Sequence, residues 1–361
     1  MRKLFLSIFA VLMLSALFIT SSADARTAQP SKNTKTTKAA TTAPIYWGAH
    51  IGDNYGLGTD APWNAAAMPD FANQMGKAPS LVEFGIWTAC DSSWEPCYTG
   101  SLSSYAAFPT TQMNAIRSYG AIPVLDVSTG NDTQSMTNQP AWTDAKIASG
   151  TYDAYFTQFA KDAKKWNHPF FLRFDWEMNG AWWPWSVGDN SNTAANYVAA
   201  WQHVHTIFTS QGVSLASWVW AVNVEPGSTT SFSAEYPGNS YVDWLGMDGY
   251  DFGTQGSPSG TFDSIFQQTY WDLYNAGTGK KIMIAEIGSD QSSATKPQFI
   301  TDSLTEIQEV SGIGAYVYMD KNEPPHNWRI DSSTAALNAF KTGIGSSAFQ
   351  TNHYGSLSTK P

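Results

Sequence analysis

Two glutamates end two short apolar segments, and their type and position suit acid–base chemistry. Glu177 follows the segment 169–176, and Glu286 follows the segment 281–285. A buried carboxylate costs stability unless it is paired or hydrogen-bonded, so its presence in such a segment calls for a reason. In one cleft, one carboxyl group can give a proton to a leaving group while the other stays ionised. Hydrolysis of a glycosidic bond requires this arrangement.

The pattern of apolar residues predicts the elements that position these glutamates. The predicted strands are 45–49, 81–87, 121–127, 170–176, 215–222, 243–248, 281–287 and 313–319, and the predicted helices are 65–76, 110–119, 152–166, 194–211, 262–275, 297–310 and 334–342. A loop is expected in place of a helix before the sixth strand. Eight strands that alternate with helices predict an α/β fold, a single (β/α)₈ TIM barrel.

An open, doubly wound parallel sheet is the alternative fold. Such a sheet would carry a glycine-rich phosphate-binding loop after its first strand. The segment Gly48-Ala-His-Ile-Gly52 lacks the required glycine spacing, so the barrel is favoured.

In a barrel, the residues that do chemistry lie at the carboxyl ends of the strands, where Glu177 and Glu286 are expected. Strand side chains alternate, which predicts that Arg173, Asp175 and Glu177 point to one side. Arg173 would then supply positive charge that keeps a neighbouring carboxylate ionised. For Asp175, a structural ion pair with Arg173 is the alternative to a role in the site.

The chain of 361 residues divides into four segments. Residues 1–25 have the features of a signal peptide, with a basic start, an apolar run and a small-residue cleavage site, although a membrane anchor is the alternative. Residues 26–43 form a Thr-, Lys- and Pro-rich linker. Residues 44–345 form the predicted catalytic barrel, and residues 346–361 form a polar C-terminal tail that is expected to be loose.

Composition narrows the possible partners. The formal net charge is −10, and the chain has no basic cluster that would neutralise phosphates, which argues against nucleic-acid binding. No membrane contact is expected after signal cleavage. Charged residues and aromatic residues each make up 14% of the chain, which suits an extracellular protein that stacks rings against a neutral polymer. Many of these rings must instead belong to the core.

The two cysteines are Cys90 and Cys97. In an oxidising compartment they are expected to form a local disulfide that closes the loop 91–96, and two free thiols are the alternative.

The segments around the two glutamates resemble the motifs of glycoside hydrolase family 26. Arg173-Phe-Asp-Trp-Glu-Met-Asn-Gly180, followed by the Trp-rich segment 181–185, resembles the acid/base motif R-P-x-H-E-M-N-G. The segment 236–250 resembles the strand-six region of that family, and Ala285-Glu-Ile-Gly288 resembles its nucleophile strand.

This resemblance implies a retaining barrel enzyme, with Glu177 as acid/base and Glu286 as nucleophile. It also implies that Tyr250 hydrogen-bonds to the nucleophile and that Trp182 stacks on a sugar near the cleavage point. The family consists chiefly of endo-β-1,4-mannanases, with some β-1,3-1,4-glucanases and β-1,3-xylanases. The expected substrate is therefore a β-linked polysaccharide, with β-1,4-mannan first, cleaved without a cofactor by a secreted, extracellular monomer.

Two positions depart from the family motif. The His before the acid/base is Trp176 here, and the Pro after the Arg is Phe174. That His normally helps to recognise the sugar being cleaved, whereas an indole donates a hydrogen bond but does not accept one. The departure leaves the catalytic pair intact and bears on which sugar is bound.

Further substrate-binding candidates are Arg173, Trp176, Asn179, Trp220, Trp328 and His50. Trp220 and Trp328 are expected either to stack on sugars or to pack in the barrel. His50 follows the first strand and either reaches the cleft or bonds to backbone. Asp126 ends the third strand, as a cleft residue or a turn cap, and Asn179 shapes the loop after the fourth strand.

No metal site is expected. His203 and His205 lie two residues apart on a predicted helix and so face different ways. The segments Asp53-Asn-Tyr-Gly56 and Asp189-Asn-Ser-Asn192 are rich in oxygen ligands, but such segments are more typical of turns than of calcium sites.

Two interpretations compete with catalysis. In the first, Glu177 and Glu286 each form a structural ion pair in the barrel mouth. In the second, the whole chain is a non-catalytic carbohydrate-binding protein on a degenerate barrel. The presence of both glutamates favours an enzyme.

Overall fold

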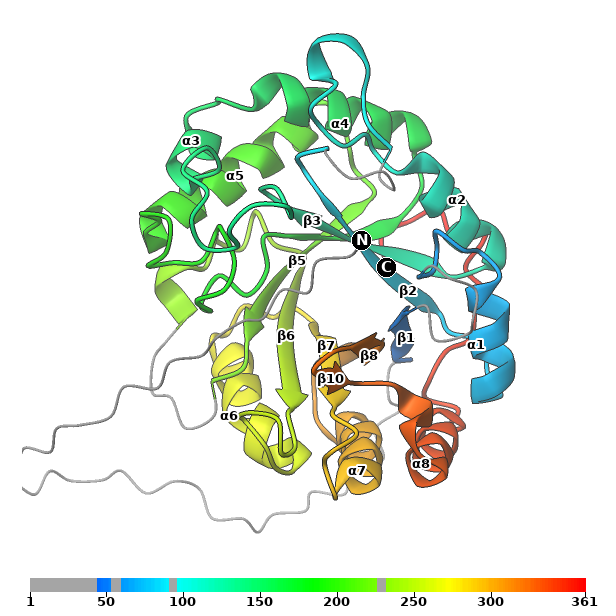
Figure 1. Ribbon diagram of the computed structural model, residues 1–361. Coiled ribbons are helices and arrows are strands. Elements are labelled where there is room, and N and C mark those ends of the chain that lie inside the picture. The colour runs from blue at the N-terminus through cyan, green and yellow to red at the C-terminus, as the bar shows by residue number, and fades with distance from the viewer. Residues whose placement is uncertain (1–43, 53–59, 91–95, 226–231) are drawn as a thin grey trace, which may run out of the picture. The chain divides into compact units, whose positions relative to one another are not determined.

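The computed structural model describes residues 44–52, 60–90, 96–225 and 232–361. In this part of the chain, eight parallel strands close into a barrel in chain order, and β8 pairs with β1. The α-helices surround the strands in a ring (Figure 1). The closed barrel confirms the prediction of a (β/α)₈ fold, and the alternative of an open sheet is wrong.

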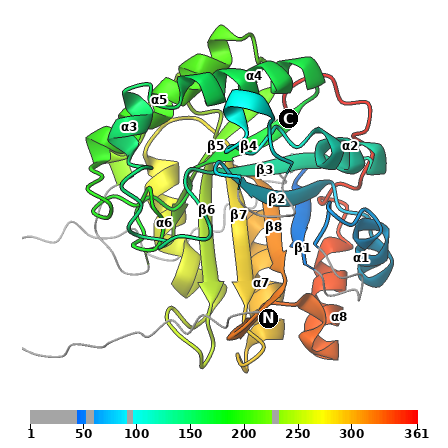
Figure 2. The ribbon, with the colours of Figure 1, turned by 45° about the horizontal axis from the view of Figure 1, so that its top comes forward.

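All eight predicted strands are present in the predicted order. They are β1 (Tyr46–Ile51), β2 (Leu81–Trp87), β3 (Ile122–Ser128), β4 (Phe170–Phe174), β5 (Ala216–Asn223), β6 (Trp244–Asp251), β7 (Ile282–Ser289) and β8 (Ile313–Asp320). Figure 2 shows β6, β7 and β8 side by side. A short antiparallel pair, β9 (Asn322–Glu323) and β10 (His326–Asn327), follows β8.

The seven predicted helices are present, and α3 (Asp144–Ala148) is an additional helix in a stretch where none is predicted. The others are α1 (Ala67–Met75), α2 (Thr110–Tyr119), α4 (Asp153–Trp166), α5 (Ala194–Ser210), α6 (Phe262–Asn275), α7 (Lys296–Glu309) and α8 (Thr334–Ile344), with short 3₁₀ helices η2 (Gly100–Leu102), η3 (Phe232–Ala234) and η4 (Ile330–Ser332). Among the described residues between β5 and β6, η3 is the only helical element, as predicted.

Local signals set the helix ends. The side chains of Thr193, Thr261 and Ser333 accept hydrogen bonds from backbone N–H groups in the first turns of α5, α6 and α8. Gly76 and Gly120 end α1 and α2 with φ angles of 75° and 101°, which favour glycine.

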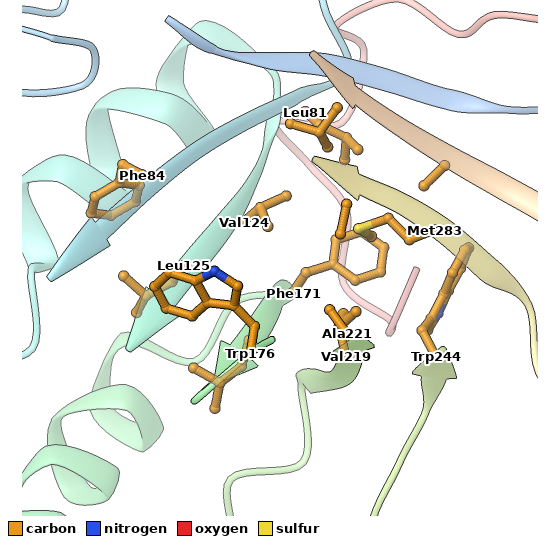
Figure 3. Close-up of a cluster of buried hydrophobic side chains, with 14 of the residues drawn as sticks. Leu81, Phe84, Val124, Leu125, Phe171, Trp176, Val219, Ala221, Trp244 and Met283 are labelled. Carbon is orange, nitrogen blue, oxygen red and sulfur yellow. The ribbon is translucent and has the colours of Figure 1, made fainter. Parts of the chain in front are cut away.

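Aromatic rings fill the barrel at the amino ends of the strands. Phe171 of β4 lies 5.2 Å from Trp244 of β6 and 6.2 Å from Tyr46 of β1, measured between ring centroids. Figure 3 shows Phe171, Trp244 and Met283 gathered inside the barrel. This apolar layer makes one end of the barrel a packed floor, so the polar groups must lie toward the carboxyl ends of the strands.

The C-terminal tail packs against this floor, and the prediction that residues 346–361 are loose is wrong. The backbone of Ile45 exchanges hydrogen bonds with Ala348 and Gln350. Phe349 is 2% exposed, and the ring of Tyr354 packs against that of Tyr46 at 5.3 Å. The apolar residues within a polar composition explain this difference from the prediction.

The remaining segment predictions have different outcomes. Cys90 and Cys97 form the predicted disulfide, with Cα atoms 5.7 Å apart. Residues 1–43, which include the predicted signal peptide and linker, lie outside the described residues, as does Asp53-Asn-Tyr-Gly56. None of the described helices is long and apolar enough to span a membrane.

We expect Phe349→Ala to lower the free energy of unfolding by about 3–5 kcal/mol, because it empties a buried site under the barrel. Denaturant unfolding measures this change. Thr359→Ala, at an exposed position of the same tail, is the matched control and should change stability by less than about 0.5 kcal/mol. Equal stability of the two variants would show that the tail is dispensable for the fold.

Candidate active site

The chain turns sharply after β4, and this turn presents Glu177. The strand ends at Phe174, two residues earlier than predicted, and Asp175 and Glu177 have φ angles of 42° and 53°. Such positive φ angles are uncommon for residues other than glycine and are typical of functional sites. A backbone hydrogen bond from Glu177 N to Ala221 O, 2.9 Å long, fixes the turn to β5.

The same turn directs Asp175 away from Arg173. Its carboxylate accepts hydrogen bonds from the backbone N and the Oγ1 of Thr129, both at 2.8 Å. Burial raises the pKa of Asp175 to about 8, although the two Thr129 bonds oppose this shift. The prediction that residues 173, 175 and 177 point to one side is therefore wrong for Asp175, because the strand geometry stops at Phe174. The alternative of an Asp175–Arg173 ion pair is also wrong.

Glu177 accepts three hydrogen bonds. The indole Nε1 atoms of Trp182 and Trp183 donate to Oε2 at 2.8 and 2.9 Å, and Asn223 Nδ2 donates to Oε1 at 3.1 Å. Burial and then the nearby charge of Glu286 raise the pKa of Glu177 to about 7, while the two indole bonds act in the opposite direction. Near neutrality this carboxyl group can therefore carry a proton and also release it.

Glu286 projects from β7 where the ladder to β6 is irregular. The register shifts between Met247 and Asp248, so that Asp248 pairs with Glu286. Such an irregularity re-aims a side chain beside a site. Tyr250 donates its hydroxyl hydrogen to Oε2 of Glu286, and Arg173 donates from Nη1 to Oε1 at 3.0 Å. A cation and a hydroxyl donor thus hold both oxygens of this carboxylate in place.

Arg173 is fully buried at the centre of the barrel and is surrounded by carboxylates. Its guanidinium lies 2.7 Å from Asp248, 3.1 Å from Asp126, 3.0 Å from Glu286 and 3.5 Å from Glu83. Four carboxylates exceed the charge of one guanidinium, so the cluster favours bound protons. Burial raises the pKa of Glu83, Asp126 and Asp248, even though Arg173 opposes the shift.

Three of these carboxylates could in principle hold a metal ion. Oxygens of Glu83, Asp126 and Glu286 all lie within 4.8 Å of one another. Nη1 of Arg173 is 3.0 to 3.5 Å from each of the three, so the guanidinium supplies the positive charge at this point. The expectation of no metal stays a prediction.

His50 lies at the end of β1 beside this cluster. Its Nε2 is 3.4 Å from Asp60 and its Nδ1 is 3.8 Å from Glu83. Burial disfavours its charged form, but the contacts with Asp60 and Glu83 outweigh burial and raise the pKa of His50 to about 9.

A cleft of about 700 Å³ contains both glutamates. Much of its wall is aromatic, from Trp63, Trp87, Trp176, Trp183, Tyr250, Phe252 and Trp328. Polar groups are contributed by Glu83, Asp126, His50 and the two glutamates. Indole and phenol rings with a few placed polar groups suit a ligand with both apolar faces and hydroxyl groups.

Most of the predicted site residues meet in this cleft. His50, Trp176, Tyr250, Trp328 and the two glutamates line it. Trp176 also covers Arg173, whose guanidinium carbon lies 5.1 Å from the centre of the Trp176 ring. Trp182 stands 43% exposed, with its N–H on Glu177.

Four predicted residues are not among those that line the cleft, namely Arg173, Trp182, Trp220 and Asn179. Trp220 is 2% exposed and packs against Tyr236, because its position on β5 faces away from the barrel interior. The prediction that Trp220 is a stacking platform is wrong. Asn179 also lies outside the cleft lining, but it bonds to both the backbone N and O of Asn223. Asn179 therefore positions the side chain that bonds to Glu177.

The sequence interpretation missed several residues of the site. Asn223 is the last residue of the apolar strand β5, and a polar residue at a strand end is the same signal that identified Glu177 and Glu286. Glu83 lies within an apolar strand, where an unpaired carboxylate is costly. Trp183 lies in the Trp-rich segment 181–185, and nothing in the sequence distinguishes it from the tryptophans beside it.

The remaining candidates have ordinary structural partners. His203 contacts Asp153, and His205 packs against Trp218 and Tyr241. The segment 189–192 is a turn whose side chains bond to backbone oxygens and amides.

The sequence is similar to that of a known family of glycosyl hydrolases. The model of glycosyl hydrolase family 26 matches residues 114–297, just over half of the chain. The chain is 37% identical over 206 residues to Endoglucanase H of Acetivibrio thermocellus, an alignment that covers 55% of this chain and 23% of that protein. The chain thus spans about a quarter of the length of that relative.

Solved structures share the fold. The catalytic domain of the endo-β-1,4-mannanase of Bacillus sp. JAMB-750 has a TM-score of 0.65 at 17% identity, over 86% of this chain and 88% of that chain. The endo-β-1,4-mannanase of Cellulomonas fimi has a TM-score of 0.64 at 15% identity, over 88% and 75%. At these identities the likeness shows the barrel fold alone.

We expect Arg173→Met to lower the free energy of unfolding by about 3–5 kcal/mol at pH 7, because the buried carboxylates lose their cation. Glu83, Asp126 and Asp248 have raised pKa values, so they take up protons as the pH falls and then need the cation less. The loss of unfolding free energy in Arg173→Met should therefore be smaller at pH 5 than at pH 7. Denaturant unfolding at the two pH values measures it.

Arg329→Met is the matched control for this prediction. Arg329 pairs with Asp331 at 2.7 Å near the surface, so its removal should cost less than about 1 kcal/mol at either pH. A loss for Arg173→Met that does not depend on pH would contradict the charge argument.

Proposed function

This chain belongs to glycosyl hydrolase family 26 and is a glycoside hydrolase, and we propose that it cleaves a β-linked polysaccharide internally and with retention of configuration. Glu177 is the acid/base and Glu286 is the nucleophile. The observation that carries this proposal is the contrast between the two carboxyl groups. Glu286 bonds to Arg173 and Tyr250, whereas Glu177 has a pKa near 7 and bonds only to neutral donors.

This contrast supports a double displacement. In the first step the Glu286 carboxylate attacks the anomeric carbon, the bond to the leaving sugar oxygen breaks, and the Glu177 proton moves to that oxygen. The sugar is then held as an ester on Glu286. In the second step water attacks the anomeric carbon, Glu177 takes its proton, and the Glu286 carboxylate leaves.

Two β-glycans compete as the substrate. The family motifs favour β-1,4-mannan. The 37% identity with a protein named Endoglucanase H favours a β-glucan, and it exceeds the identity with the solved mannanases. Trp176 adds to this, because its indole offers the cleft no hydrogen-bond acceptor for a sugar hydroxyl. We therefore place a β-glucan with 1,3-1,4 linkages first and β-1,4-mannan second.

The chain is further proposed to act outside the cell as a monomer, after loss of residues 1–25. The basic start and apolar run support export, and the Cys90–Cys97 disulfide suits an oxidising compartment. A mature N-terminus other than one close to residue 26 would contradict the cleavage.

The substrate is tested with purified protein on mixed-linkage β-glucan, β-1,4-mannan and β-1,3-xylan, by release of reducing ends. We expect the highest kcat/KM on the glucan and a fall in polymer viscosity that precedes most of the sugar release, because internal cleavage shortens chains first. Higher kcat/KM on mannan would reverse the order of the two substrates. Binding without release from any of them would contradict catalysis.

The roles of the two glutamates are separated by leaving-group chemistry. Glu177→Ala should lower kcat on polymer by about 10²–10⁴-fold but affect an aryl glycoside with an acidic phenol much less, because that leaving group needs no proton. Glu286→Ala should abolish the cleavage of both substrates. Glu309→Gln, at the exposed end of α7, should leave both rates unchanged. Equal losses on both substrates for Glu177→Ala would rule out its role as the acid.

A further inference from the structure

Three N–H groups donate to the carboxylate of Glu177, which leaves about one of its four lone pairs free. Each carboxylate oxygen can accept about two hydrogen bonds. Oε2 accepts one from Trp182 and one from Trp183, and Oε1 accepts one from Asn223. Three N–H donors stabilise the anion, yet a general acid has to carry a proton before it reacts. The free lone pair on Oε1 leaves room for that proton, and weakening any of the three donor bonds would raise the proton affinity of the acid.

The two indole donors are held very differently. Trp183 stacks on Trp185 with ring centroids 5.2 Å apart and planes at 13°, and it also contacts Trp176 at 5.6 Å and Trp87 at 6.2 Å. Movement of Trp183 would break this aromatic packing.

Trp182, by contrast, is 43% exposed, and no other aromatic ring of the described residues stacks against it. Its ring lies over Gly180, where a Cβ atom would come within 2.6 Å of the indole. This close approach explains the glycine, while the side chain of Trp182 as a whole stays 43% exposed. Trp182 is thus the donor that can leave Glu177 without disturbing the core.

We propose that Trp182 is a positioning residue that holds Oε2 of Glu177 in the free enzyme and releases it when a sugar covers the exposed indole ring on the leaving-group side. This inference rests on the proposed role of Glu177 as the acid. A ligand that packs on the ring in only one of two orientations shifts the population toward that orientation. Ring faces of tryptophan offer the apolar area for such packing.

Release of Trp182 changes the proton affinity of Glu177. The charged or titratable groups that act on Glu177 are Glu286 from β7, Arg173 from β4, and Asp248 and Tyr250 from β6. Burial and Glu286 raise the pKa of Glu177, while the bonds from Trp182 and Trp183 and the charge of Arg173 lower it. The loss of the Trp182 bond removes one lowering contribution, so Glu177 takes a proton from solvent as the sugar binds. That proton then moves to the leaving-group oxygen.

The pH dependence of two kinetic constants tests this inference. The alkaline limb of kcat/KM reports the free enzyme, and that of kcat reports the enzyme with sugar bound. In the natural protein, kcat should begin to fall at a higher pH than kcat/KM does. Trp182→Phe should raise the kcat/KM limb by roughly one pH unit and leave the kcat limb in place, because the bond is already absent in the complex.

Two other variants separate this role from general damage. Trp183→Phe removes the donor that stays in place, so it should raise both limbs together. Trp271→Phe removes a tryptophan of similar exposure, 46%, on α6, and should move neither limb. If Trp182→Phe moves both limbs equally, or moves neither, the inference is wrong.

A second measurement needs no turnover. The indole N–H resonance of Trp182, assigned by its loss in Trp182→Phe, should titrate near pH 7 in the free protein and not in Glu177→Gln. Addition of cellotriose or mannotriose should remove this titration. Its persistence with either sugar bound would overturn the inference even if the enzyme is active. Inactivity on every polysaccharide would instead overturn the proposed function.

Discussion

The buried guanidinium of Arg173 is the charge around which the carboxyl end of the barrel is organised. It draws carboxylates from β2, β3, β6 and β7 to within 3.5 Å of one side chain. A buried ion cluster of this kind contributes little net stability, since the desolvation of each charge offsets the attraction between them. What the cluster provides is orientation. The guanidinium and Tyr250 bond to both oxygens of Glu286, which holds that carboxylate in place.

The two ends of the barrel have opposite properties. At the amino ends of the strands, Tyr46, Phe171 and Trp244 form a packed aromatic floor that the C-terminal tail covers. At the carboxyl ends, acidic groups and tryptophans surround an open cleft. The open end holds residues with positive φ angles and carboxyl groups whose pKa values are raised by burial. Asp175 and Glu177, with their positive φ angles, are supported by hydrogen bonds to β3 and β5.

The two carboxyl groups of the site differ because their neighbours differ. Glu286 bonds to a cation that cannot lose its proton, while Glu177 bonds to indole and amide N–H groups that carry no charge. Burial and the charge of Glu286 then raise the pKa of Glu177 into the range where an acid can also act as a base. The Trp-rich segment after β4 thus has two functions, because it forms the cleft wall and also sets the proton affinity of the acid.

The sequence alone determined the order of the eight strands and the place of both glutamates, because apolar periodicity and strand-end carboxylates are local patterns. It also identified the segment around Glu177 by its motif. Period-two alternation failed at Asp175, since nothing in the local sequence marks a left-handed residue there, and Trp220 was misplaced because a strand pattern does not tell which face is the barrel interior. Only the tertiary structure decided the partners of Arg173. The three carboxylates to which it donates hydrogen bonds lie 47 to 113 residues away along the chain. Contacts over such separations depend on barrel closure and register, and no local pattern encodes them.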